Sequence, residues 1–349
     1  MKTLFEPFTI KKTTFRNRIG LPPMVCFTMG NNQGLVSDQH IVHYREIAQG
    51  GVGFIIQEAT CVLEDGRLSD TQLGMWNDQQ LPGLQSLVQA VHAEGCPILV
   101  QIHHAGLISI SSDPMAPSRF TARGKTSHEM SLEEIRQVQD AFVEAAKKAV
   151  VLGYDGIELH GCHSYLISQF YNRKVNQRQD EYGQDKNRFT LEILIRIKQV
   201  VPADFLVGIR LGGFEPTLEE AIEHARLLEQ HGIDFIDVSY GFSGQEEIEL
   251  PKNTTLKDIH YAAQQIKKAV KVPVFTVNGI RSKEDAEKIL EESNVDALHL
   301  GKNHLVDPAW VNHIRSQQLA GKCLNCVRCM HYSKPELCPG RLLFQRLKK

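Results

Sequence analysis

The fold of this chain is decided by the stretch YDGIELHGCHSY at residues 154–165. Its apolar first half is typical of a buried strand, which is expected to end where the polar residues begin. His160, His163 and Tyr165 would then project from one strand-to-helix loop. Two imidazoles and a phenol can donate hydrogen bonds to an oxygen that gains negative charge, and the phenol can also deliver a proton. A lone His-x-x-His is more often a pair of solvated loop histidines, so the rest of the chain has to decide.

Apolar, strand-like runs of this kind recur along the chain. Eight of them begin at Ile19, Gly53, Pro97, Gly156, Phe205, Phe235, Val274 and Ala297. Segments of helical period lie between them, and the clearest starts at Ser131, which forms a capping box with Glu134. Thr217 and Glu220 repeat the device, and Gly153 and Gly232 end the two helices.

Alternating strands and helices predict an α/β protein built on a parallel sheet, and eight such units fit a (β/α)₈ TIM barrel. A doubly wound sheet is the rival fold. However, no GxGxxG follows the first strand, and the chain has no Walker loop and no GxSxG elbow. The sequence therefore favours the barrel.

Composition favours a small molecule as the partner. The 349 residues are 42% apolar, carry a net charge of −2 and include no long Lys/Arg run, which argues against nucleic acid. The N-terminal residues lack the apolar core of a signal peptide, and no run of about 18 apolar residues would span a membrane. The expectation is a cytoplasmic protein without a membrane partner. The oligomeric state is left open, and a homo-oligomer is compatible with the sequence.

Polar residues gather at the expected carboxyl ends of the other strands, where barrels form their active sites. They are Gln101, His103, Arg210, Asn278, Gly279, Gly301 and Lys302. The long aperiodic segment 104–130 is expected to be a lid over the barrel mouth or, alternatively, a mobile surface loop.

These motifs together resemble the Old Yellow Enzyme family of FMN-dependent ene reductases and NAD(P)H:flavin oxidoreductases. The matching stretches include FRNRIGLPPM, GGVGFIIQEATCV, VQIHHAG, IELHGCHSYLISQF, VGIRL, VNGI and LGKNHLVDPAW. The resemblance covers nearly all of residues 1–320, which it implies are an FMN-binding barrel domain. A cysteine-rich tail, 321–349, would follow.

The resemblance implies FMN at the barrel mouth, held at its ring, at the polar edge of the ring and at its phosphate. The residues are Pro23, Met24, Val25 and Ala59 at the ring, Gln101 and Arg210 at the polar edge, and Asn278, Gly279, Gly301 and Lys302 at the phosphate. Arg210 would stabilise the negative charge of the reduced flavin. Backbone N–H groups after the seventh and eighth strands would hold the phosphate.

By the same resemblance, His160 and His163 would hydrogen-bond the oxygen of an activated alkene, such as an α,β-unsaturated carbonyl or nitro compound. Tyr165 would protonate the carbon that does not receive hydride. NAD(P)H would reduce the flavin first in the same pocket and then leave, giving ping-pong kinetics. Val25 stands where the family often has Thr or Cys, and Leu107 and Lys302 stand where it often has Arg, so substrate choice is left open.

The tail carries Cys323, Cys326, Cys329 and Cys338. They look like the iron–sulfur ligands of the larger relatives 2,4-dienoyl-CoA reductase and trimethylamine dehydrogenase, although the last gap is shorter. A 4Fe–4S cluster, a zinc ion and free thiols are the three interpretations. The alternative function is a flavin-binding redox sensor or electron carrier that works through this cluster. A metal-dependent hydrolase or aldolase using the two histidines is a third class, but the sequence argues against it, because no further His/Asp set at the other strand ends completes a metal site.

Overall fold

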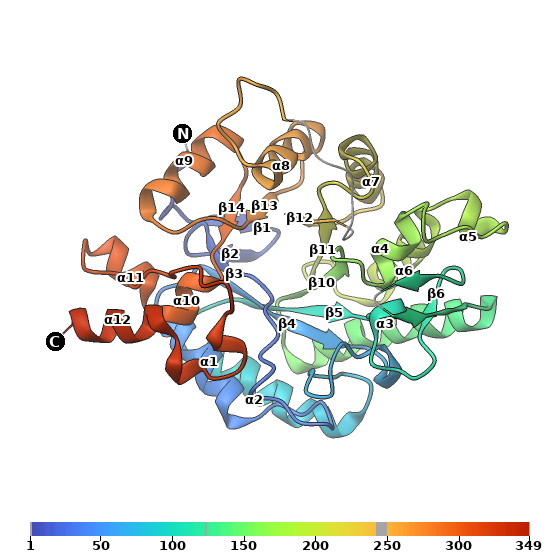
Figure 1. The fold of residues 1–349 in the computed structure, drawn as a ribbon, viewed down its shortest axis with the longest axis horizontal. Coiled ribbons are helices and arrows are strands. Elements are labelled where there is room, and N and C mark those ends of the chain that lie inside the picture. The colour runs from blue at the N-terminus through green and yellow to red at the C-terminus, as the bar shows by residue number, and fades with distance from the viewer. Residues whose placement is uncertain (1, 123, 242–249, 349) are drawn as a thin grey trace.

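Eight parallel strands close into a barrel at the centre of the molecule (Figure 1). The computed structural model describes residues 2–122, 124–241 and 250–348, so Met1, Arg123, 242–249 and Lys349, which belong to the predicted domain ranges, lie outside the described residues. The barrel strands are β3 (Ile19–Leu21), β4 (Phe54–Cys61), β5 (Ile98–His103), β10 (Gly156–Gly161), β11 (Leu206–Gly212), β12 (Phe235–Ser239), β13 (Val274–Val277) and β14 (Ala297–His299). They are the eight predicted strands in sequence order, with β14 pairing back to β3, and the predicted TIM barrel is confirmed.

Helices surround the strands and cover the barrel on its outside (Figure 1). The longer ones are α1 (Asp38–Gln49), α2 (Leu81–His92), α3 (Leu132–Leu152), α6 (Arg188–Val200), α7 (Leu218–Gln230), α8 (Asp258–Ala269) and α9 (Lys283–Ser293). The shorter ones are α4 (Leu166–Tyr171), α5 (Glu181–Gln184), α10 (Lys302–Val306), α11 (Trp310–Arg315) and α12 (Pro339–Leu347).

Two predicted helix caps are seen in the structure. Ser131 and Glu134 make both hydrogen bonds of a capping box at the start of α3, and Gly153 ends it with a φ of 86°. Thr217 accepts from the backbone N–H of Glu220, so only this half of the second predicted box is formed.

A short N-terminal hairpin closes the end of the barrel where the strands begin. It consists of β1 (Phe8–Ile10) and β2 (Thr13–Phe15), which pair antiparallel. Phe8 stacks on Phe15 with ring centroids 4.9 Å apart, and Phe15 meets Phe54 of β4 at 4.8 Å. The sequence did not predict this hairpin, because strands of three residues are too short to show a periodic pattern. With this end filled by aromatic rings, the opposite end is the one available for a site.

The aromatic filling predicts a sharp effect at Gly208 of β11. A Cβ atom there would lie 2.1 Å from Cζ of Phe235, a ring that is stacked on Phe275. Gly208→Ala should therefore destabilise the protein by about 1–3 kcal/mol through overpacking. Urea unfolding measures the change, and Phe235→Leu in the same chain should recover part of it. Unchanged stability of Gly208→Ala would contradict the packing seen here.

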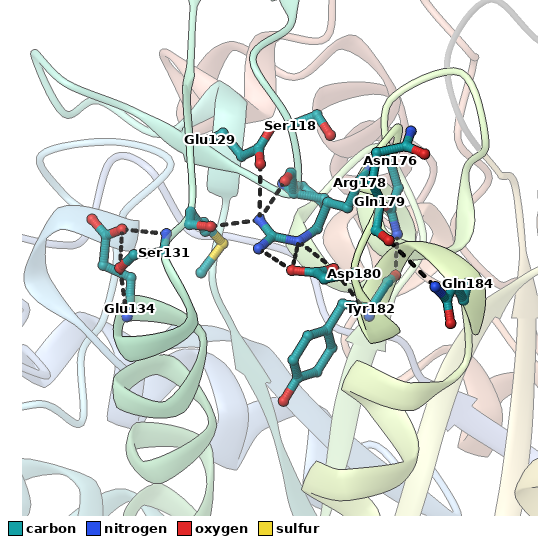
Figure 2. A network of polar contacts seen from close by, with 12 residues as sticks. Ser118, Glu129, Ser131, Glu134, Asn176, Arg178, Gln179, Asp180, Tyr182 and Gln184 are labelled. Carbon is teal, nitrogen blue, oxygen red and sulfur yellow. Dashed lines mark hydrogen bonds and ion pairs between the residues drawn. The ribbon is translucent and has the colours of Figure 1, made fainter.

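The segment after β5 is held in place by Arg178, which lies at the centre of Figure 2. The Arg178 guanidinium donates to the carbonyl oxygens of Pro117 and Met130 and forms an ion pair with Asp180. The segment contains four two-residue strands, β6 (Met115–Ala116), β7 (Thr121–Ala122), β8 (Lys125–Thr126) and β9 (His128–Glu129), which the sequence did not predict. Its role as a lid stays a prediction.

Candidate active site

The three predicted catalytic side chains lie together at the carboxyl end of β10. Nε2 of His160 is 3.0 Å from Nδ1 of His163. The plane of the Tyr165 ring makes an angle of 64° with the His160 ring and 85° with the His163 ring. The distances between ring centroids are 4.6 Å to His160 and 6.4 Å to His163. The strand end and the loop after it thus bring two imidazoles and a phenol to one place. Their catalytic roles remain to be tested.

The backbone of the loop explains how His160, His163 and Tyr165 can converge. His163 and Ser164 both adopt the left-handed conformation, with φ values of 63° and 67°. A non-glycine residue in this region is uncommon and typically marks a functional or strained position. The double left-handed turn reverses the chain between β10 and α4, so that Tyr165, the N-cap of α4, packs beside His160.

The imidazole pair is connected to the predicted flavin-contacting arginine through Ser239, at the end of β12. Nε2 of His163 is 2.8 Å from Oγ of Ser239, and Nη2 of Arg210 donates to the same oxygen at 3.3 Å. Arg210 also forms an ion pair with the fully buried Asp237 at 3.1 Å, and Asp237 contacts Nδ1 of His299 at 3.2 Å. Sequence reasoning missed both residues. Ser239 is the last residue of the predicted strand that begins at Phe235, where a polar residue is a candidate for the site, whereas Asp237 lies in the middle of that strand.

Two buried carboxyl groups support the predicted ring-binding residues. Gln101 donates from Nε2 to Oε1 of Glu158 at 2.7 Å. Oε2 of Glu58 accepts from the backbone N–H of Cys26 at 2.8 Å, which fastens the loop carrying Pro23, Met24 and Val25 to β4. Burial raises the pKa of Glu58 to about 7. Glu58 was not predicted as a site residue, and only its place beside Ala59 in the sequence could have suggested a supporting role.

A pocket of about 270 Å³ opens beside these groups. Seven of the ten predicted cofactor residues line it, namely Pro23, Met24, Arg210, Asn278, Gly279, Gly301 and Lys302, whereas Val25, Ala59 and Gln101 are outside its lining. A Cβ atom on Gly301 would meet Sδ of Met24 at 2.5 Å, and Gly279 has a φ of 69°.

The lining of the pocket suits an anionic ligand with a phosphate group, such as FMN. Glycine at Gly279 and Gly301 leaves backbone N–H groups open to close approach by a phosphate. Lys302 reaches Asn325 at 3.1 Å in this structure, and its ammonium group is exposed at the same wall of the pocket. The buried Nε2 of His299, another lining residue, has no hydrogen-bond partner among the described residues, which leaves a polar atom for a ligand.

The imidazoles of the site are neutral. Burial lowers the pKa of His163 to about 3, with the positive charge of Arg210 acting in the same direction. Burial likewise holds the pKa of His160 well below its ordinary value. Neutral imidazoles can donate one hydrogen bond each without carrying charge, which suits polarisation of an oxygen rather than proton delivery.

Buried neutral histidines also predict a pH dependence of stability. Burial lowers the pKa of His224, His260 and His304 from 6.5 to about 4, so below pH 6.5 the unfolded chain binds more protons than the folded one. These three histidines and His163 should therefore lower the free energy of unfolding as the pH falls from 6.5 towards 4. Glu58 acts oppositely, because its raised pKa favours the folded state below pH 7.

The imidazoles outnumber this carboxyl, so the free energy of unfolding should drop by on the order of 5 kcal/mol between pH 7 and pH 4.5. Urea titrations at half-unit pH steps measure the change. A stability that rises steadily over this window would contradict the burial of these rings.

Two sets of possible metal ligands behave differently. His160, Cys162 and His163 bring one ligand atom each within 4.8 Å of one another. No three of the predicted tail ligands Cys323, Cys326, Cys329 and Cys338, all of which belong to the described residues, meet this spacing. None of the four forms a disulfide bond, and none is buried. An iron–sulfur cluster spreads its thiolates further apart than a single ion does, so the spacing bears on zinc rather than on a cluster.

Comparison with known proteins gives consistent matches. The sequence model of the family described as "NADH:flavin oxidoreductase / NADH oxidase" matches residues 3–320. The chain is 36% identical over 342 residues to an NADH oxidase of Thermoanaerobacter brockii, covering 93% of this chain and 52% of that protein. It is 36% identical over 321 residues to an NADPH dehydrogenase of Clostridium acetobutylicum, covering 88% of this chain and 93% of the relative.

Among solved structures, a 2-naphthoyl-CoA reductase complex superposes with a TM-score of 0.83 at 26% identity, covering 90% of this chain and 52% of that one. This chain thus spans about half the length of the NADH oxidase and of the 2-naphthoyl-CoA reductase chain, but most of the NADPH dehydrogenase. No helix within the described residues is long and apolar enough to cross a membrane. The family match to most of the chain, and relatives of more than one-third identity, show that this protein belongs to the NADH:flavin oxidoreductase / NADH oxidase family of FMN-dependent oxidoreductases.

Proposed function

We propose that this protein oxidises NAD(P)H and reduces activated alkenes, such as α,β-unsaturated carbonyl or nitro compounds, in a ping-pong cycle. The observation that carries the proposal is the convergence of His160, His163 and Tyr165 beside the pocket lined by Arg210 and Gly301. When bound, FMN supplies a two-electron carrier between the nicotinamide and the alkene. The NADPH dehydrogenase relative, covered over 93% of its length, supports the first half of this activity.

The side chains of the site divide the work. An acceptor oxygen would replace His163 Nδ1 and Ser239 Oγ as the partners of Nε2 of His160 and Nε2 of His163. Two such donors stabilise charge that develops on the oxygen and make the far carbon a better hydride acceptor. Tyr165 holds the proton for the other carbon. Arg210 provides the positive charge that favours an anionic reduced ring.

For the domain organisation, we propose that residues 1–320 form the FMN-binding barrel and 321–349 a short cysteine-rich tail. The family match to residues 3–320 supports this division. Within the tail, Cys323, Cys326, Cys329 and Cys338 are proposed as ligands of a 4Fe–4S cluster. The support is their spacing in the sequence, which suits iron–sulfur ligands. Cys323 also lines the same pocket as Gly301 and Lys302.

A second candidate function follows from the position of Cys323 in the lining of the pocket. A flavin-binding redox sensor or electron carrier would exchange electrons through the tail and would need no alkene. Iron, sulfide and zinc analysis after anaerobic purification distinguishes a cluster from a zinc ion and from free thiols.

The proposed function is tested by absorbance and steady-state kinetics. The purified protein should be yellow and release FMN on denaturation, and cyclohexenone should accelerate NAD(P)H oxidation. Double-reciprocal plots at several fixed enone concentrations should be parallel, as a ping-pong cycle requires. A yellow protein that oxidises NAD(P)H without any response to the enone would favour the sensor. A colourless protein that does not bind added FMN would overturn both readings.

A further inference from the structure

A third buried imidazole lies against the catalytic pair. His103 is the last residue of β5, and its Nδ1 is 3.0 Å from Nδ1 of His160 on the neighbouring strand β10. Its ring also meets the Tyr165 ring edge-on, with centroids 4.4 Å apart at 89°. The side chain is completely buried, and its backbone carbonyl accepts from the N–H of Val62 at 3.0 Å. His103 is therefore fixed in position before any ligand arrives.

The contact between two Nδ1 atoms restricts where the protons can be. Both rings are neutral, so each carries one N–H and one acceptor nitrogen. One Nδ1 must therefore donate and the other accept. If His103 donates, the proton of His160 must lie on Nε2. If His160 donates, its Nε2 is bare and can only accept.

The same choice passes along the chain of hydrogen bonds to Ser239. With a proton on Nε2, His160 donates to Nδ1 of His163, which then carries its own proton on Nε2 and donates to Oγ of Ser239. Nη2 of Arg210 donates to that oxygen as well, and a hydroxyl oxygen can accept twice. In the reverse direction, Ser239 donates to His163 and both Nε2 atoms of the pair are bare. Only the first direction leaves two Nε2–H groups for a substrate oxygen.

We propose that His103 is a positioning residue that holds His160, and through it His163, in the Nε2–H form. Nδ1 of His160 is already hydrogen-bonded to the buried His103, so Nε2 is the nitrogen that a ligand can use. Whether Nε2 of His160 carries a proton, and so can donate, depends on whether His103 donates to Nδ1 or accepts from it. This is the arrangement in which the second nitrogen of a histidine sets its tautomer. The inference rests on the proposed function, because it explains how both imidazoles become donors.

Imidazole tautomers can be measured directly by nitrogen NMR on protein labelled with ¹⁵N-histidine. In the FMN-loaded wild type, the His160 signals, assigned by their loss in His160→Ala, should show the proton on Nε2. His103→Leu removes the donor and should shift His160 to a mixture with Nδ1–H. His103→Asn should restore the wild-type pattern, because its amide nitrogen takes the place of the donating Nδ1.

Kinetics provide the second measurement. Cyclohexenone reduction should fall about tenfold in His103→Leu, as expected for one hydrogen bond, and recover in His103→Asn. His104→Asn is the matched control, because His104 is the next residue along the chain and is also buried. Its Nδ1 accepts a hydrogen bond from the backbone N–H of Gly106 and does not contact His160. It should leave the His160 tautomer unchanged.

The inference is overturned if wild-type His160 carries its proton on Nδ1, or if His103→Leu leaves it on Nε2. The wild-type spectrum gives this answer even if His103→Leu fails to fold. The wild-type spectrum also reports the tautomer of His160 if the protein reduces no alkene. Failure of the inference is therefore distinguishable from failure of the proposed function.

Discussion

Tyr165→Phe should slow alkene reduction by about 100- to 10,000-fold, the usual contribution of a general acid. Reduction of FMN by NAD(P)H should stay close to the wild-type rate, because hydride transfer from the nicotinamide requires no proton from this phenol. The fold should be unaffected, since the ring packing against His103 and His160 at 4.4 and 4.6 Å is kept. Stopped-flow absorbance of the two half-reactions measures each rate separately.

The control for this experiment is another phenol outside the site. Tyr182 of α5 donates to Oε2 of Glu192 at 2.7 Å, and Tyr182→Phe should leave both half-reactions unchanged. Equal losses in the two half-reactions of Tyr165→Phe would remove Tyr165 from the role of proton donor and would point to a role in binding.

Arg210→Met should destabilise the protein by about 3–5 kcal/mol, because it leaves the buried Asp237 carboxylate without its ion-pair partner. It should also weaken FMN binding, because the positive charge at the polar edge of the ring is lost. The side chains of Arg210 and Asp237 are 7% and 0% exposed and 3.1 Å apart. Burial pushes the pKa of Asp237 upward, but His299 and Arg210 together hold it below its usual value. Removing the arginine removes one of these two supports. Urea unfolding of the FMN-free protein measures the effect on stability.

A double variant separates the ion pair from the cofactor. Arg210→Met with Asp237→Asn removes both charges, and it should recover most of the lost stability of the FMN-free protein. FMN affinity should stay weak in this variant, because the positive charge at the polar edge of the ring is still missing. If the double variant is as unstable as Arg210→Met alone, the pair does not contribute as its geometry indicates.

Much of the site could be predicted before the structure because strand order and strand ends are local properties. The run from Gly156 to Leu159 predicts a buried strand, and the polar residues after it must then lie at the barrel mouth. For the same reason, Arg210 and Gly279, at the ends of other predicted strands, were expected nearby, and both line the pocket. In a barrel, all parallel strands end at the same face.

Other features could not be predicted because their signals are short or non-local. The N-terminal hairpin and the strands within 104–130 are two or three residues long, below the length at which alternation is recognisable. Glu58 resembles any polar residue in a strand until its 2.8 Å contact with the N–H of Cys26 is seen. The tail cysteines are the opposite case, because their sequence pattern is clear but its meaning is not decided by the structure. Their spacing suggests an iron–sulfur cluster, and this stays a prediction.

The sequence by itself determined the barrel, the end at which the site lies and the chemical types gathered there, since periodicity and strand order are encoded in neighbouring residues. The tertiary structure decided which atoms face each other. The contacts of Nδ1 of His103 with Nδ1 of His160, and of Arg210 with Asp237, join residues far apart in the chain. The strength of hydrogen bonds and ion pairs changes when the distance between the two atoms changes by a few tenths of an ångström. Distances between residues on different strands are set only when the barrel closes.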